Sequence, residues 1–113
     1  AWLARVNREL VEGATHGSFV CALAGYHDPV TGETCWANAG LPSVLRVDID
    51  GTRRFRAEGP PLGILADMDF PEQRTNLRDA SLYLFSDGVT DARRPDGSMI
   101  GLDGAESLLL EAH

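Results

Sequence analysis

The order of the sequence patterns predicts an α+β fold. Residues 2–12 carry apolar side chains at helical spacing, residues 18–86 carry short apolar segments separated by turn sequences, and a second helical pattern begins at Asp103. A helix, a run of antiparallel strands and a final helix are typical of α+β domains. The 113 residues are enough for one such domain with a modest core, so we expect residues 1–113 to form a single domain.

The first helix is predicted from Trp2, Val6 and Leu10, which share one face of residues 2–12, and Gly13 is its expected C-terminal cap. The next segment, residues 18–26, is apolar on both faces of an extended chain. A strand of this kind is usually covered on both faces, so we expect it to lie centrally in a layered domain.

A tight turn follows, because residues 28–32 read Asp-Pro-Val-Thr-Gly. Pro29 presets a type I turn and Gly32 tolerates the left-handed conformation of a bulge, so residues 33–38 should return antiparallel.

The rest of the chain predicts further strands and a final helix. A polar turn that ends in Asp50-Gly51 joins the next hairpin, and Asp103 with Glu106 forms a capping box that opens the final helix, whose apolar side is residues 108–110. The expected strands lie at residues 43–47, 52–57, 70–77 and 81–86. A stiff Gly-Pro loop is expected at residues 59–63 and a short helical turn at residues 89–93.

Composition narrows the classes of function. The net charge of −7 disfavours binding to nucleic acid, and the arginines at 53, 54, 56, 93 and 94 read first as solvated faces. No apolar stretch approaches the ~20 residues of a membrane span, and no signal-peptide pattern precedes the first helix, so we expect a cytoplasmic protein. Cys21 and Cys35 lie in apolar strand patterns and are expected to be buried free thiols.

Asp87 is the candidate functional residue that the residue pattern alone selects. It ends an apolar segment and is followed by Gly88, and residues 89–93 lack the alternation of a returning strand. A carboxylate at the end of a buried strand suits a hard metal ion such as Mg²⁺ or Mn²⁺. The alternative is an ordinary Asp-Gly hairpin turn. A two-ion site needs several carboxylates, so Asp87 alone is a candidate ligand without a complete site.

Several longer phrases carry a resemblance. In order, the chain reads VNREL, FVCALAGYHDPVTGETCWANAG, GPPLGI and LYLFSDGVTDARRPDGSMIG. This resembles the SpoIIE/RsbU family of bacterial PPM-type (type 2C-like) phosphatases, whose phrases are LN..L, F.T, D..TG, NAGH.P, G.PLG, L.LYTDGV.EA and a glycine that opens the last helix. The match covers nearly the whole chain, with the phrases in the same order.

The resemblance implies an α-β-β-α sandwich of two antiparallel sheets flanked by helices. It also implies hydrolysis of phosphoserine or phosphothreonine by a water that two Mn²⁺ or Mg²⁺ ions activate, without a phosphoenzyme. Asp87 matches the metal-binding Asp of the TDG phrase. The substrates that the family implies are phosphorylated anti-sigma-factor antagonists in stress or sporulation signalling.

The departures from the family are also informative. The family's other acidic phrases lie upstream of the first helix and beyond the last one, so we expect residues 1–113 to be the C-terminal portion of a longer phosphatase domain. Leu41 replaces the His of NAGH, Cys21 replaces a Thr, and Asp79-Ala80 replaces a Gly-Asp. The last two concern packing and a turn, whereas Leu41 bears on a loop near the site.

The other polar residues have ordinary interpretations beside functional ones. Asn38 is expected to stabilise the turn at Ala39-Gly40. His16 and His27 read as loop histidines. Asp91, one helical turn after Asp87, reads as a first-turn carboxylate or as a residue that orients the metal ligands without binding the metal. Arg93 and Arg94 are solvated or meet a phosphorylated partner.

Two alternatives to the enzyme remain open: a catalytically silent regulatory module that binds a partner, and an unrelated small α+β binding domain. If the enzyme reading holds, the 113-residue chain alone should be inactive. It should also self-associate, because strand edges that the rest of the domain would cover are left exposed.

Overall fold

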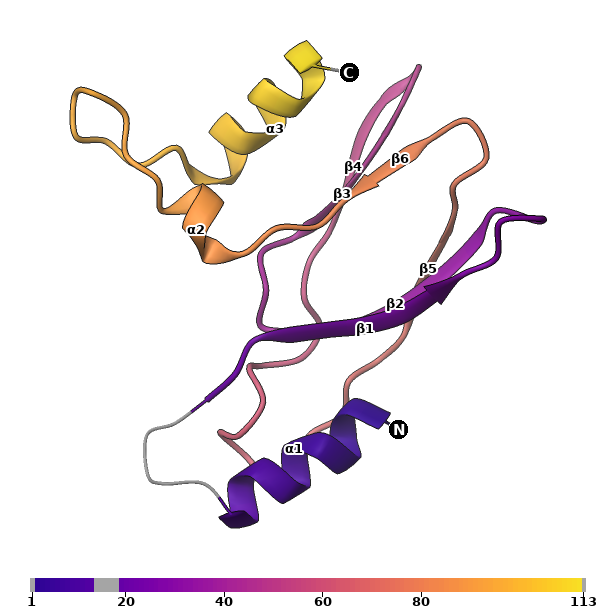
Figure 1. Cartoon of the computed structure of the whole chain (residues 1–113), viewed down its shortest axis with the longest axis vertical. Helices are drawn as coiled ribbons and strands as arrows, with labels where there is room; N and C mark the ends of the chain where they lie inside the picture. The colour runs from indigo at the N-terminus through magenta and orange to yellow at the C-terminus, as the bar shows by residue number, and fades with distance from the viewer. Residues whose placement is uncertain (1, 14–18, 113) are drawn as a thin grey trace. The chain divides into compact units, whose positions relative to one another are not determined.

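The computed structural model describes residues 2–13 and 19–112, and His16 and the start of the strand expected at Ser18 lie outside them. The described residues form two three-stranded antiparallel sheets and three helices, which confirms the α+β class with two antiparallel sheets (Figure 1). The chain divides into two compact units, Ala1–Leu41 with Ala57–Arg78 and Pro42–Arg56 with Asp79–His113.

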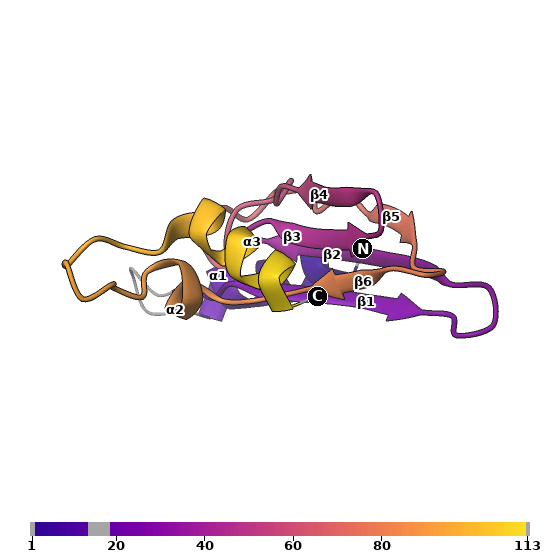
Figure 2. The ribbon, with the colours of Figure 1, turned by 90° about the horizontal axis from the view of Figure 1, so that it is seen from above.

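Each unit combines one sheet with helix. The sheet of the first unit has the order β1-β2-β5, and that of the second unit has the order β4-β3-β6 (Figure 2). The first unit contains α1 (Trp2–Gly13), β1 (Ala22–His27), β2 (Glu33–Ala39) and β5 (Gln73–Asn76). The second contains β3 (Val44–Asp48), β4 (Gly51–Phe55), β6 (Ser81–Tyr83), α2 (Asp87–Thr90) and α3 (Gly101–Ala112).

Helix α1 is confirmed, but its buried face is rotated from the expected one. Leu3 packs in a core with Ala39, Leu62 and Phe70, and Val6 and Leu10 line it, whereas Trp2 is 67% exposed. Leu3 and Leu10 are separated by two helical turns, so they share a stripe that Trp2 does not join.

Asn7 is the second buried residue of α1 and is 1% exposed. Its Oδ1 accepts a hydrogen bond from Gly63 N at 2.7 Å, and its Nδ2 donates to Leu65 O at 2.6 Å and to Ala66 O at 3.3 Å. A buried amide is tolerated when it is hydrogen-bonded, and here it fastens α1 to the loop at residues 63–66.

The expectation that residues 18–26 are covered on both faces is wrong for the described structure. Strand β1 begins at Ala22 and lies at one edge of its sheet, with β2 in the middle. Phe19 and Tyr26 are 59% and 62% exposed. Among the described strands, β2 and β3 are the well-buried ones, and apolar composition alone did not separate them from β1.

The turn between β1 and β2 is confirmed. Asp28 Oδ1 accepts from Val30 N at 2.8 Å, Gly32 N donates to Asp28 O at 2.8 Å, and Gly32 has a φ of 84°. The expected hairpin of β3 and β4 is also present, with Asp48 paired to Gly51.

Two expectations in the second unit need correction. Strand β6 pairs over three residues and stops at Tyr83 rather than continuing to residue 86. Helix α3 begins at Gly101, so Asp103 lies in its first turn and does not open a capping box with Glu106. Glu106 instead accepts from Thr52 Oγ1 at 2.7 Å and from Arg54 Nε at 2.6 Å.

Arg54 therefore joins β4 to α3. Its Nη2 also donates to Asp103 Oδ1 at 2.5 Å, so this arginine is not simply solvated as expected. Arg53, its neighbour, lies over the ring of Phe55 with its Cζ 4.5 Å from the centroid.

Asn7→Leu should destabilise this chain by about 2–4 kcal/mol, because one N–H and two carbonyl groups lose a partner in a part-buried loop. Arg8→Ala is the matched control on the same helix, since it removes an exposed ion pair with Asp67 that is worth less than about 1 kcal/mol. Denaturant unfolding of the two variants measures the difference. Equal losses would show that the Asn7 amide contributes nothing beyond an exposed contact.

Glu106→Gln should weaken the pH dependence of stability. The hydrogen bonds from Thr52 and Arg54 hold the pKa of Glu106 below its ordinary value. A lowered pKa stabilises the folded chain above the unfolded-state value of about 4 and loses this contribution as pH falls through the folded-state value.

Urea unfolding between pH 7 and pH 3 is therefore expected to show lower stability at pH 7 by about 1 kcal/mol and a shallower acid loss for Glu106→Gln. Glu111→Gln, an exposed change on the same helix, should follow the parent curve. The interpretation fails if Glu106→Gln keeps the full acid loss.

Candidate functional site

Asp87 is the first residue of α2, four residues beyond the last paired position of β6. Ser86 is the N-cap, with extended backbone (φ −92°, ψ 174°), and its Oγ accepts from Gly88 N at 3.3 Å. Val89 N donates to Ser86 O at 3.1 Å and Asp91 N donates to Asp87 O at 2.7 Å, so the chain continues into a helical turn. The hairpin-turn alternative for Asp87-Gly88 is therefore wrong.

The side chain of Asp87 is exposed, and it forms no hydrogen bond or ion pair with any residue in 2–13 or 19–112. Its backbone carbonyl, by contrast, accepts from both Asp91 N and Thr90 Oγ1, the latter at 3.3 Å. The backbone is thus held by the cap and the helical turn while the carboxylate oxygens remain available to an external ligand.

Asp87 does not lie in a metal-binding cluster within the described residues. They contain no group of three or more His, Cys, Asp or Glu side chains that could hold a metal ion. Asp91 is exposed and forms the C-cap of α2, one turn beyond Asp87, so its role in orienting the metal ligands stays a prediction. A carboxylate suits Mn²⁺ or Mg²⁺ chemically, and the described residues supply one ligand of the several that a two-ion site needs.

Two phrases of the family meet in the first unit. Asn38 Oδ1 accepts from Leu41 N at 3.0 Å and its Nδ2 donates to Leu41 O at 3.4 Å, which confirms Asn38 as a turn-stabilising residue. Gly40 N donates to Gly59 O at 3.0 Å, and Gly40 has a φ of 81°. The turn that carries Leu41 therefore packs on the Gly-Pro loop.

Sequence reasoning missed how tightly that packing depends on Gly40. A Cβ at Gly40 would lie 2.5 Å from Pro61 Cγ and 2.8 Å from Pro61 N. The two phrases WANAG and GPPLG each look like a turn sequence, and their contact joins segments about twenty positions apart in the sequence. Neither phrase, taken alone, indicates that the two segments contact each other.

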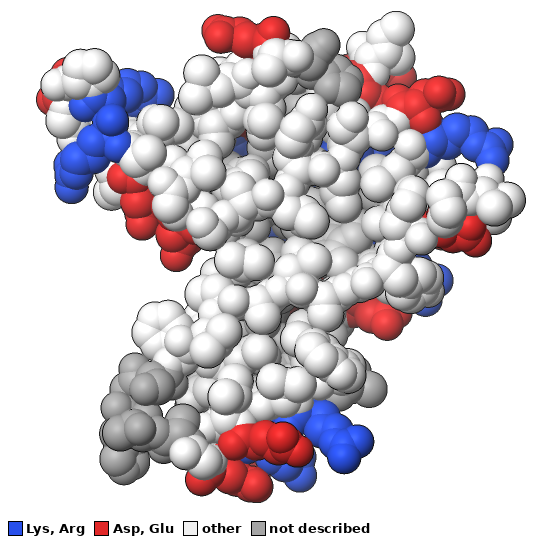
Figure 3. Space-filling model, viewed as in Figure 1, with Lys and Arg blue, Asp and Glu red and all other residues white. Residues whose placement is uncertain are grey.

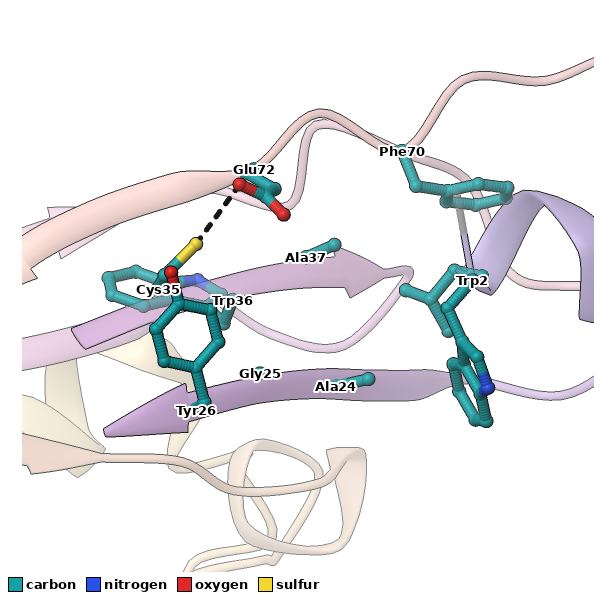
Figure 4. A pocket seen from close by; sticks show the side chains of 10 residues that line it. Trp2, Ala24, Gly25, Tyr26, Cys35, Trp36, Ala37, Phe70 and Glu72 are labelled. Carbon is teal, nitrogen blue, oxygen red and sulfur yellow. Dashed lines mark hydrogen bonds between the residues drawn. The ribbon is translucent and has the colours of Figure 1, made fainter. Parts of the chain in front are cut away.

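The first unit also contains a groove of about 200 Å³ that is lined in part by a thiol, a carboxylate and aromatic side chains (Figure 4). Cys35 Sγ donates to Glu72 Oε2 at 3.2 Å at one end, next to Tyr26, and Trp2 and Phe70 lie toward the other end. Burial, followed by the hydrogen bond to Glu72, raises the pKa of the Cys35 thiol. Because the thiolate is the reactive form, Cys35 is a structural thiol. Both cysteines are free as expected, but only Cys35 is buried, and Cys21 is half-buried.

The remaining residues singled out in the sequence lie away from Asp87 in the sequence. His27 ends β1 rather than lying in a loop, and its Nδ1 is 2.8 Å from Thr34 Oγ1. Asp79 has a φ of 57°, which fits the position where the family has glycine. Gly101 begins α3 with a φ of 67°, in agreement with the glycine that opens the family's last helix.

Comparison with known protein families decides the affiliation. The family model described as Stage II sporulation protein E (SpoIIE) matches residues 1–113. The chain belongs to the SpoIIE family. This is a family of PPM-type phosphatase domains, so the resemblance read from the sequence is confirmed. The searches of curated proteins and of solved structures gave no significant match. Among the described residues, no helix is both long and apolar enough to cross a membrane.

Gly40→Ala should destabilise the chain more than Gly97→Ala. Both glycines have positive φ, 81° and 90°, but a Cβ at Gly97 meets nothing within 4 Å. The left-handed backbone costs a non-glycine residue about 1–2 kcal/mol at either position, and the clash with Pro61 adds about 1–3 kcal/mol at Gly40. Thermal unfolding of the two variants compares them. Equal effects would mean that the Pro61 contact relaxes without cost.

Proposed function

We propose that this chain is part of a phosphatase domain that hydrolyses phosphoserine or phosphothreonine on a bacterial signalling protein. Asp87 would be one ligand of a Mn²⁺ or Mg²⁺ site. Membership of the SpoIIE family over residues 1–113 supports the phosphatase class. The observation that carries the assignment of Asp87 is its exposed carboxylate, which has no partner among the described residues and stands on a capped backbone after β6.

Bound ions of this kind lower the pKa of a water and neutralise charge that develops on a phosphoryl group. The residues of this chain would hold one metal ligand, Asp87, in a fixed backbone position. Ser86 fixes the start of α2 through its bond with Gly88 N, and the bond from Asp91 N to Asp87 O closes the turn. The further carboxylates would come from the acidic phrases that flank this region in the family.

The proposed substrate is a phosphorylated anti-sigma-factor antagonist, and the proposed location is the cytoplasm. Membership of the SpoIIE family, whose members act in sporulation-related signalling, supports both proposals. The net charge of −7 supports a protein substrate over nucleic acid, because an acidic domain repels a phosphate backbone.

A catalytically silent regulatory module is the second candidate. Two observations favour it: Leu41 stands where the family has His, and Asp87 has no neighbouring carboxylate cluster within the described residues. The silent module and the enzyme differ in turnover, and the next experiment separates them.

Asp87→Asn should lose most of the Mn²⁺-dependent hydrolysis of a phosphoserine peptide in a full-length protein that carries the flanking acidic phrases. A loss of about 100-fold or more in kcat is expected, since an amide is a poor ligand for a hard dication. Asp79→Asn is the matched control: it makes the same chemical change at an exposed turn residue whose φ of 57° suits Asn.

The 113-residue chain alone should show no appreciable turnover in the same assay. Full activity of Asp87→Asn would remove Asp87 from the metal site. A full-length parent without turnover would support the silent module, and turnover by the isolated chain would contradict the need for flanking ligands.

A further inference from the structure

We propose that the loop at residues 92–100 docks the substrate, with Arg93 and Arg94 binding acidic side chains of the phosphoprotein close to its phosphorylated residue. The inference rests on the proposed function, because it assigns a substrate contact to the loop that directly follows Asp87 and α2. All of its parts belong to the second unit.

The loop is held in one conformation by its own backbone. Arg94 N donates to Ser98 O at 2.8 Å, Gly97 N donates to Arg94 O at 2.9 Å, and Ile100 N donates to Ala92 O at 2.7 Å. Asp96 Oδ1 accepts from Ser98 N at 2.9 Å and from Ser98 Oγ at 2.6 Å. A preformed loop loses little further conformational entropy on binding, which favours its use as a docking element.

The two arginines have most of their hydrogen-bonding capacity left. Arg93 Nη1 donates to Gly97 O at 2.7 Å and Arg94 Nη1 donates to Met99 O at 3.0 Å, whereas a guanidinium has five N–H donors. Both side chains are exposed, and neither forms a salt bridge within the described part of the chain. Figure 3 shows basic side chains on the loop that projects between α2 and α3.

Nearby carboxylates offset the charge of this pair in part. Hydrogen bonds from Ser98 and then the positive charge of Arg94 lower the pKa of Asp96, and Asp103 of α3 pairs with Arg54. In a chain with a net charge of −7, two adjacent arginines without a salt bridge make a local positive site that attracts a carboxylate or a phosphate.

Arg94 is also positioned by α3. A Cβ at Gly104 would lie 2.7 Å from Arg94 Nη2, so the guanidinium lies over this glycine. It borders an open hollow of about 450 Å³ whose lining includes Asp103, Ser107 and Leu108. A larger residue at position 104 would displace the guanidinium, and the hollow leaves room beside it for a partner's side chain.

The distance between Asp87 and Arg93 limits how far from the phosphorylated residue an acidic side chain of the substrate could contact the loop. Four residues of α2 advance the backbone by about 6 Å, and the two residues from Asp91 to Arg93 add at most about 7 Å. The Cα atoms of Asp87 and Arg93 therefore lie within about 13 Å, which an extended peptide spans in about four residues. We accordingly expect an acidic residue no more than about four positions from the phosphorylated residue of the substrate.

The test compares two phosphoserine peptides with the full-length protein, one with Asp and one with Asn four positions from the phosphoserine. The double variant Arg93→Gln/Arg94→Gln should raise KM for the Asp peptide about five- to tenfold, because two exposed charge pairs are lost. The kcat for that peptide, KM for the Asn peptide and turnover of p-nitrophenyl phosphate should stay within about twofold.

Arg5→Gln/Arg78→Gln is the matched control, since both residues are exposed and the net charge changes by the same amount. An equal rise of KM in this control would overturn the proposal, because the effect would then be one of overall charge. Equal KM values for the parent and for the Arg93→Gln/Arg94→Gln variant would overturn it as well.

A binding measurement separates this proposal from the proposed function. Fluorescence anisotropy of the labelled Asp peptide on the Asp87→Asn protein, without added Mn²⁺ or Mg²⁺, gives Kd without turnover, and adding the two arginine changes should weaken binding about five- to tenfold. Unchanged Kd would contradict the docking role whatever the activity of Asp87→Asn. Weaker binding together with full activity of Asp87→Asn would contradict the metal assignment and retain the docking site.

Discussion

The buried amide of Asn7 is the interaction on which the first unit depends. It satisfies Gly63 N, Leu65 O and Ala66 O from one side chain that is 1% exposed. The apolar contact of α1 centres on Leu3, so the helix buries a narrow stripe. A polar anchor at the middle of that stripe fixes the rotation of the helix, because another rotation would leave three backbone groups without partners.

In the second unit, charged side chains rather than a buried amide hold the helix against the sheet. Helix α3 has one buried residue, Ala105, and is joined to β4 by Arg54, which binds Glu106 and Asp103. These bonds are partly exposed, so each is worth less than a buried contact, but together they fix where α3 meets the strand. The position of α3 also affects the loop between α2 and α3, because Arg94 of that loop lies over Gly104 of α3.

Patterns with local causes were predictable from the sequence, and contacts between distant segments were not. The turn at Asp28 and Gly32 follows from the conformational preferences of its own residues. The expected burial of Trp2 was wrong because the core beneath α1 contains Leu3, with Val6 and Leu10 packed against it, and leaves Trp2 67% exposed. The partners of Asn7 and Glu106 lie more than fifty positions away, and no local pattern identifies them.

At the candidate site, too, the local feature was predictable from the sequence and the contribution of distant segments was not. A carboxylate after an apolar segment could be selected at Asp87 from sequence, and the cap by Ser86 explains why its backbone is fixed while its oxygens stay available. Hard-metal catalysis needs several such oxygens at one point, which a single segment cannot supply. The same segment continues through α2 into a hydrogen-bonded loop with two exposed arginines. A segment that holds an exposed carboxylate on a fixed backbone and then presents two arginines a short distance away suits the roles proposed for it in metal binding and in substrate docking.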